Sequence, residues 1–375
     1  MTTDRRTLLQ GAAAWAAWSC SPWAAAQTAV ATPAAPSGAR TFDPRPGLWR
    51  TFEVTTRVDI LTTDGTTRVW LPVPSVNTDW QQSGVSSFSS NGNARMRYDS
   101  LQGVQMLVAE FSPQVETPYV EITSRVQTQN RAASVALATS VPAEDAATLK
   151  YFTRPTQLLP TDGIVRDTAQ KAIAGATTDA DKVRAIYDWI VANAWREPKV
   201  RGCGEGDIKT MLETGNLGGK CADINALFVG LCRSVGIPAR DVYGLRLAPS
   251  AFGYKELSGN PVNLKGAQHC RAEAYVKGRG WMAMDPADVA KVMRLETPEW
   301  IKSPQHPVVQ PVYQKLLGGW EGNWVAWNMA HDVTLPGSKG DRLGFFMYPV
   351  AENNEGRLDS YSPDDFKYQI SAREI

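Results

Sequence analysis

The segment from residue 218 to residue 240 reads GGKCADINALFVGLCRSVGIPAR and carries the strongest structural pattern of the chain. Its apolar residues recur every three or four positions and predict an amphipathic helix that begins near Cys221. Gly236 and Pro238 mark the end of this helix. The apolar stripe consists of Ile224, Leu227, Phe228, Leu231, Cys232 and Val235. Because Cys221 precedes Ile224 by three residues, we expect its side chain on the same buried face.

Cys221 stands at the start of the predicted helix, directly after two glycines and Lys220. The first N–H groups of a helix have no partner within it, and the helix dipole favours negative charge there. A thiol in this position ionises more readily than an ordinary cysteine, and the thiolate is the nucleophilic form. Cys232 lies deep in the apolar stripe and is expected to be a buried structural residue. From position alone, Cys221 is compatible with a nucleophile and with a second structural cysteine.

Strand-like segments follow the helix at residues 239–247, 269–276 and 281–285. His269 begins the second of them, and Asp285 ends the third. A cysteine at a helix start, with a histidine and an aspartate on neighbouring strands, is the arrangement that nucleophilic acyl transfer needs. We therefore predict that Cys221 is the nucleophile, that His269 is its base and that Asp285 orients the histidine.

The pairing of His269 with Asp285 restricts the turn between their strands. On antiparallel strands, residues that face each other have a constant sum of residue numbers, and two residues share a face only when their own sum differs from it by an even number. A two-residue turn at Gly278 and Arg279 would place the two side chains on opposite faces. A loop of three or five residues within 276–280, or a bulge before Asp285, would place them on one face. We predict that the two-residue turn is absent.

Residues 161–290 are predicted to form one α+β domain. Its first clear helix follows Thr178 and Asp181, which are spaced as a capping box. Residues 47–130 are predicted to form an antiparallel β module, because apolar residues alternate from Phe52 to Ile60 and again around residues 69–73, 104–108 and 120–126. The pair Asp64 and Gly65 predicts a hairpin turn between the first two of these strands.

The amino terminus has the features of an export signal. Arg5 and Arg6 precede an apolar run at residues 8–18, and three alanines at residues 24–26 suit signal peptidase. We predict a twin-arginine signal peptide at residues 1–27, a flexible linker at 28–46, and a periplasmic or otherwise exported protein. The apolar run is too short for a retained membrane span. Lipidation at Cys20 is the alternative, and the bulky Trp18 fits it poorly.

Composition excludes several function classes. The net charge is +1, so the chain has no overall field that would attract nucleic acid or an anionic membrane. Hydrophobic residues make up 43% and charged residues 21% of the chain, which is ordinary for a globular protein and argues against disorder. We expect neither a nucleic-acid partner nor a membrane span in the mature protein.

Three motifs resemble those of the transglutaminase-like superfamily. The first is GKCAD at residues 219–223, continued by LFV at 227–229 and RSVGIPAR at 233–240. The second is QHCRAEAY at residues 268–275, and the third is GW at 280–281 with DPA at 285–287. VWLPVP at residues 69–74 resembles a region that accompanies this domain in exported bacterial proteins. The resemblance implies a papain-like α+β core, in which the helix of the nucleophile packs on an antiparallel sheet behind a β-sandwich-like module.

The resemblance also implies a chemistry. It points to an exported cysteine enzyme that cleaves amide or isopeptide bonds through a thioester acyl-enzyme, with water more expected than an amine as acceptor. Peptides, proteins and peptidoglycan stems are the expected substrates. The family commonly supplies a second oxyanion contact from an upstream side chain, for which Trp195 and Asn216 are the candidates here. No loop resembles an EF-hand, and we predict no cofactor.

Several alternatives remain open. Cys203, Cys270 and His269 are zinc-binding residue types, but no C-x-x-C pair exists, and Cys270 and His269 should point to opposite faces of a strand. In an oxidising compartment Cys203 and Cys270 would be able to form a disulfide, although sequence does not determine the connectivity. A catalytically silent envelope scaffold is the non-enzymatic alternative.

The carboxyl-terminal extension, residues 291–375, is the least informative part of the sequence. Its tryptophans at positions 300, 320, 324 and 327 favour packing at a domain seam over a substrate groove. The histidines outside the predicted core, His306 and His331, are interpreted as surface or loop residues because proline and glycine interrupt the sequence around them.

Overall fold

The structure is a computed structural model that describes residues 40–61, 65–132, 141 and 143–375, and all of these belong to one compact unit. The predicted signal peptide at residues 1–27 and the alternative lipidation site at Cys20 lie outside the described residues. Within the described ranges, no helix has both the length and the apolar character that a membrane crossing requires.

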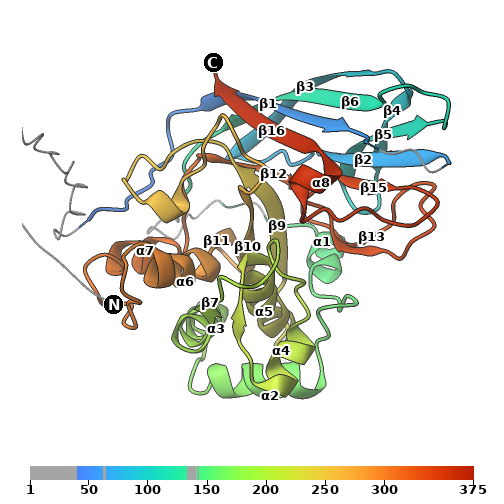
Figure 1. Cartoon of the computed structure of the whole chain (residues 1–375). Coiled ribbons are helices and arrows are strands. Elements are labelled where there is room, and N and C mark those ends of the chain that lie inside the picture. Colours follow the sequence, from blue (N-terminus) through green and yellow to red (C-terminus); the bar gives the residue numbers. More distant parts are fainter. Residues whose placement is uncertain (1–39, 62–64, 133–140, 142) are drawn as a thin grey trace, which may run out of the picture. The chain divides into compact units, whose positions relative to one another are not determined.

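Two four-stranded antiparallel sheets build the β module (Figure 1). The first has the order β16 (Tyr368–Glu374), β1 (Arg50–Asp59), β6 (Tyr119–Thr128) and β3 (Gln81–Ser90). The second has the order β15 (Val350–Glu352), β2 (Thr67–Val73), β5 (Val104–Phe111) and β4 (Asn93–Asp99). Buried residues of both sheets, such as Val54 and Leu107, belong to one hydrophobic core. This confirms the predicted β-sandwich-like module.

The predicted hairpin between the first two strands is wrong. β1 pairs with β6 and β16, whereas β2 pairs with β5 and β15, so the connection after Ile60 crosses from one sheet to the other. Alternate residues of β1 are buried. In β2 six of the seven residues are buried, including all five from Val69 onward. Each strand contributes its apolar face to the shared core, and period-two patterns look the same in a hairpin and in a sandwich.

The second part of the fold is an antiparallel sheet covered by helices. Its strand order is β11 (Gly280–Met284), β10 (Gln268–Val276), β9 (Ala239–Arg246) and β12 (Trp324–Asn328). Helix α5 (Cys221–Ser234) packs on β9 and β10. Four further helices surround it: α2 (Gly163–Ala172), α3 (Asp179–Asn193), α4 (Ile208–Thr214) and α6 (Pro286–Leu295). This arrangement confirms the predicted α+β core (Figure 1).

Helix α5 is buried over its whole length, not only along the predicted stripe. The sheet covers one side, and neighbouring helices cover the other. At Gly230 the approach is so close that an added Cβ would lie 2.1 Å from the Cδ1 atom of Ile208. The helix ends as predicted, with Val235 as C-cap and Gly236 in the left-handed region at φ +83°.

Helix α3 begins with the predicted capping box. Thr178 accepts a hydrogen bond from the backbone N–H of Asp181, whose carboxylate accepts one from the N–H of Thr178. The remaining short elements are α1 (Ala146–Tyr151), β7 (Trp195–Arg196), β8 (Gly218–Gly219), the 3-10 helix η1 (Lys255–Leu257), α7 (Gln310–Lys315), β13 (His331–Val333), β14 (Leu343–Phe345) and α8 (Pro363–Phe366).

The register between β10 and β11 confirms the predicted turn. Val276 faces Gly280 and Ala272 faces Met284, so facing residues sum to 556 and residues 277–279 form a three-residue loop. Asp285 directly follows β11, opposite the position of Arg271 in this register. The carboxylate therefore projects toward the same face as the histidine two residues before Arg271.

Residues 291–375 contribute strands to the sheets of both parts of the fold, since β12 extends the central sheet while β15 and β16 extend the two sheets of the β module. Trp320, Trp324 and Trp327 are buried, as predicted for packing at a seam, whereas Trp300 is 37% exposed. His306 is exposed, but the surface interpretation is wrong for His331. The latter is buried in β13, with Nε2 3.1 Å from Asp241 Oδ2.

Residues 40–46, within the segment predicted as a linker, include one buried aromatic side chain. Phe42 is 3% exposed, and its ring lies 5.0 Å from that of Phe252 and 5.9 Å from that of Tyr254. Arg40, two residues earlier, forms an ion pair with Glu296. These contacts attach the beginning of the described chain to the segment around η1 and to the end of α6.

Candidate functional site

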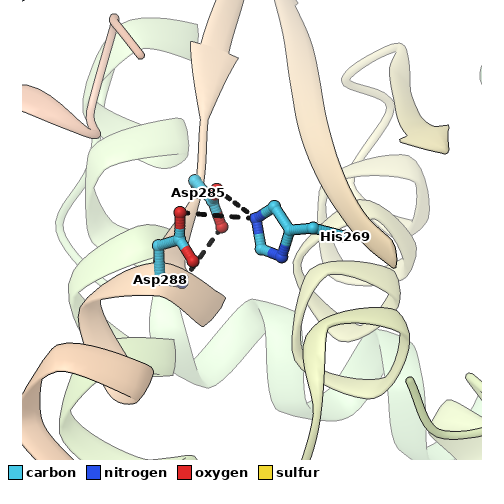
Figure 2. A group of neighbouring side chains, drawn as sticks. All are labelled: His269, Asp285 and Asp288. Atoms are coloured by element: carbon cyan, nitrogen blue, oxygen red, sulfur yellow. Dashed lines mark hydrogen bonds and ion pairs between the residues drawn. The ribbon is translucent and has the colours of Figure 1, made fainter. Parts of the chain in front are cut away.

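The structure brings Cys221, His269 and Asp285 together. Cys221 is the first residue of α5, His269 lies near the start of β10, and Asp285 follows β11, and all three are buried. Nε2 of His269 lies 2.8 Å from Oδ2 of Asp285 (Figure 2). Because the carboxylate occupies Nε2, the other ring nitrogen, Nδ1, is the one available to Cys221.

Local structure holds the aspartate in place. Asp285 is the N-cap of α6, and its Oδ1 atom accepts a hydrogen bond of 3.0 Å from the backbone N–H of Asp288. Asn225, on the buried face of α5, donates to the same oxygen at 3.2 Å and to the carbonyl of Cys270 at 2.9 Å. One asparagine thus ties the nucleophile's helix to the strand of the histidine and to the aspartate.

A second carboxylate lies beside the histidine. Oδ2 of Asp288 is 3.4 Å from Nε2 of His269 (Figure 2). Both oxygens of Asp288 also bind the guanidinium of Arg246. Burial would raise the pKa of Asp288, but Arg246 and His269 outweigh it and hold this pKa well below its usual value. Burial and the charge of Asp288 raise the pKa of Asp285. The firmest negative charge near the imidazole therefore belongs to Asp288.

These carboxylates favour a protonated His269. Burial and the nearby Arg246 guanidinium would lower the pKa of the imidazole, but Asp288, Asp285 and the hydrogen bond to Asp285 raise it to about 9. At neutral pH the ring is then an imidazolium that donates from both nitrogens. Such a group stabilises an anion in front of Nδ1.

The pKa of the Cys221 thiol is lowered, which complements the raised pKa of His269. Burial would raise its pKa, but hydrogen-bonding contacts with Cys203, Cys270 and His269, together with the histidine's charge, bring it well below the ordinary value. The neighbouring thiols respond oppositely, since Cys221 and burial raise the pKa values of Cys203 and Cys270. The site therefore favours one thiolate, on Cys221, paired with the imidazolium.

Asp223 holds the start of α5 against the preceding loop. Its carboxylate accepts hydrogen bonds of 2.9 Å from the backbone N–H groups of Glu205, Gly206 and Lys220. The N–H of Ala222 donates to the carbonyl of Cys203, also at 2.9 Å. Among the described residues, no hydrogen bond takes up the N–H of Cys221 itself. That N–H is a ready donor to an oxygen bound next to the sulfur.

A cavity of about 630 Å³ opens onto Cys221 and His269. Asn216 does not reach it. This residue is exposed, lines a different hollow and accepts a hydrogen bond from the N–H of Gly218. Trp195 is not among the residues that line the cavity, whereas its neighbour Arg196 is. The structure therefore does not bring the two predicted side-chain oxyanion donors to the cavity that contains Cys221.

The structure supports neither alternative for the cysteines, the zinc site or the disulfide. The four cysteines within the described ranges, at positions 203, 221, 232 and 270, are all free, so the alternative disulfide between Cys203 and Cys270 does not form. The ligand atoms of His269, Asp285 and Asp288 lie within 4.8 Å of one another, which is close enough for a metal ion. Arg246 already occupies both oxygens of Asp288, however, and a second cation would have to displace it.

Sequence reasoning missed three of the residues that build the site. Asp288 carries a weak signal, an acidic residue three positions after an N-cap, but such residues are common in first helical turns. Trp324, whose indole N–H donates to the carbonyl of His269 at 2.8 Å, comes from a distant strand. Arg246 ends β9, and nothing in its local sequence pairs it with Asp288.

Comparison with known proteins agrees with this fold. A family model described as the transglutaminase-like superfamily matches residues 166–286. A protein of Haemophilus influenzae, described as uncharacterized, is 34% identical over 343 residues, which cover 86% of this chain and 91% of the relative.

Two solved structures are similar. The crystal structure of a candidate cysteine protease from Cytophaga hutchinsonii is 16% identical, covers 88% of this chain and 92% of its own, and gives a TM-score of 0.54. The periplasmic domain of TgpA from Pseudomonas aeruginosa is 14% identical over 71% of this chain and 93% of its own, at a TM-score of 0.33. The first shares the fold, and the second is too distant to carry an argument. On the family match and the full-length relative, this chain belongs to the transglutaminase-like superfamily.

Proposed function

We propose that the protein is a cysteine hydrolase that cleaves amide or isopeptide bonds through a thioester acyl-enzyme, with Cys221, His269 and Asp285 as its catalytic group. The observation that supports this most directly is the hydrogen bond from His269 Nε2 to Asp285, which leaves Nδ1 for a thiol at the start of a buried helix. Burial of an ion pair costs desolvation free energy, and perturbed ionisable groups beside a cavity are typical of catalytic sites. This favours catalysis over a silent scaffold.

The proposed reaction has two halves. The Cys221 thiolate attacks the carbonyl carbon, the C–N bond breaks, and the leaving amine takes a proton from the His269 imidazolium. Water then attacks the thioester and gives a proton to the neutral imidazole, and the C–S bond breaks. The products are an amine and a carboxylic acid, and the thiolate–imidazolium pair is restored. The N–H of Cys221 is positioned to donate to the oxyanion in both halves.

We favour water over an amine as the acceptor, and we place the reaction outside the cytoplasm because residues 1–27 predict a twin-arginine signal. Peptides, proteins and peptidoglycan stems are substrates that such a compartment contains. A primary amine in place of water would convert the same acyl-enzyme into a transamidase, so the acceptor is the feature to test.

Mature protein should be incubated with a peptide library, and separately with casein and a fluorescent primary amine, with Cys221→Ala as control. We expect cleavage without incorporated label. Incorporation of label in the wild type alone would replace hydrolysis with transamidation. If neither product forms on any amide substrate, the enzymatic proposal fails and the protein is better regarded as an envelope scaffold.

The pH dependence of activity follows from the two shifted pKa values. The active form needs a thiolate on Cys221 and a proton on His269. As pH falls, activity is lost only when Cys221 protonates, well below the usual thiol pKa of 9.0, and as pH rises, activity is lost as His269 deprotonates at about 9. We therefore expect a profile that is flat through neutral pH and falls above about pH 9.

The acid limb is measured by the rate at which iodoacetamide alkylates Cys221, with peptide mapping to identify the modified cysteine. A neutral thiol paired with a neutral imidazole would instead give an alkylation rate that rises through pH 8 to 9, as for a free cysteine. That result would contradict the ion pair.

A further inference from the structure

The cavity in front of Cys221 is strongly cationic. Five of its lining residues are Arg or Lys: Arg196, Lys220, Arg246, Lys265 and Lys291. Among the described residues that line it, none is Asp or Glu. This distribution differs from that of the whole chain, whose net charge is only +1. The excess is local to the place where a substrate would bind.

Three of these cations already have an acidic partner. Arg246 binds Asp288, Lys265 binds Asp364, and Nζ of Lys291 lies 3.4 Å from a carboxylate oxygen of Glu256. Their charges are largely balanced within the protein, and a bound anion would gain little from them.

Arg196 and Lys220 have no such partner. Neither forms an ion pair with a carboxylate in the described part of the chain, and Nε of Arg196 is buried without a hydrogen-bond acceptor. Asp223, the acidic residue in the first turn of α5, already accepts hydrogen bonds from three backbone N–H groups. A buried guanidinium N–H without an acceptor is costly, and an anionic ligand would remove the cost.

The two cations lie close to each other and to the nucleophile. Arg196 faces Gly219 in the pairing of β7 with β8, and Lys220 directly precedes Cys221. Burial and the nearby Arg196 guanidinium lower the pKa of Lys220, as expected for two neighbouring positive charges. A guanidinium binds a carboxylate through two parallel N–H groups, and an ammonium group adds a third donor.

We infer, building on the proposed function, that Arg196 and Lys220 form an anion subsite that selects amide substrates carrying a carboxylate near the scissile bond. A γ-glutamyl amide is an example of this class, because its α-carboxylate remains charged when the side-chain carboxyl is in amide linkage. The thiolate of Cys221 and the imidazolium of His269 balance each other's charge, and the other three cations of the cavity have acidic partners. Arg196 and Lys220 therefore carry the charges that a bound carboxylate would balance.

The subsite can be tested with a pair of alkylating probes before any substrate is known. Iodoacetate and iodoacetamide differ by a carboxylate next to the reacting carbon, and both alkylate cysteine thiols. The alkylation rate with iodoacetate divided by that with iodoacetamide should fall by about tenfold in Arg196→Gln and in Lys220→Gln, and further in the double variant. Lys199→Gln removes the same charge from an exposed residue outside the cavity and should keep the wild-type ratio. An unchanged ratio in the double variant would overturn the inference.

A substrate pair separates this inference from the proposed function. The p-nitroanilides of γ-glutamate and 4-aminobutyrate differ only in the α-carboxylate. We expect a higher kcat/KM for the γ-glutamyl compound in the wild type, with the preference lost in the double variant. If Arg196 and Lys220 instead acted as a second oxyanion donor, the double variant would turn over both compounds more slowly and to the same extent. Turnover of both compounds without preference would contradict the anion subsite but not the hydrolase. A charge-dependent alkylation ratio without turnover of any amide would support the subsite and contradict the hydrolase.

Discussion

Cys221→Ser should lose nearly all turnover, by several orders of magnitude, while the protein remains folded. Sulfur and oxygen differ little in size, so the packing at the start of α5 should persist. The hydroxyl does not form the thiolate-like nucleophile that the site favours, because an alcohol ionises at far higher pH than a thiol. The measurements are kcat/KM on an amide substrate, together with the thermal unfolding midpoint as the test of the fold.

Cys203→Ser is the matched control, because Cys203 is a buried thiol in contact with Cys221 but is not the proposed nucleophile. Its loss should be much smaller and should appear mainly as a shift of the acid limb, since Cys203 contributes to the low pKa of Cys221. If Cys221→Ser retained activity and Cys203→Ser did not, the nucleophile would have to be reassigned.

Asp285→Asn should lower kcat/KM by about 10²- to 10⁴-fold. Asparagine is also a good N-cap, so α6 should keep its first turn. The amide no longer supplies the negative charge that helps to raise the pKa of His269, and it permits the wrong tautomer of the ring. The alkaline limb of the pH profile should therefore move below the wild-type value of about 9. A purely structural role would lower activity without moving that limb.

Asp288→Asn provides the comparison, since Asp288 also raises the pKa of His269 but has Arg246 as its main partner. We expect it to lower stability because it leaves a buried guanidinium without its carboxylate. A loss of less than about tenfold in Asp285→Asn, with a larger loss in Asp288→Asn at equal folded fraction, would mean that Asp288 orients His269.

Local sequence determined the elements that carry the site. The apolar spacing from Ile224 to Val235 and the glycine that follows it were sufficient to place helix α5. Residue parity was sufficient to exclude the two-residue turn and to put His269 and Asp285 on one face. These features depend on residues within about twenty positions of one another, where backbone geometry sets the spacing directly.

Tertiary structure alone decided the pairing of the β module. β1 lies beside β16, with Phe52 facing Glu374, and the alternation of β1 is compatible with any partner strand. The predicted hairpin failed for this reason, because a buried face does not identify the sheet that covers it. Long-range pairing depends on which apolar faces are left to bury once the whole chain is present.

The electrostatics of the site also required the fold. The residue types of the three catalytic candidates could be predicted from sequence. Asp288 and Trp324, however, contact His269 from two separate elements, and Arg246 binds Asp288 from a third. The same holds for Arg196 and Lys220, which are ordinary surface residue types in sequence and become a shared cationic wall only through the pairing of β7 with β8. Charges act through space over a few ångströms, and only the folded chain determines which charges lie that close.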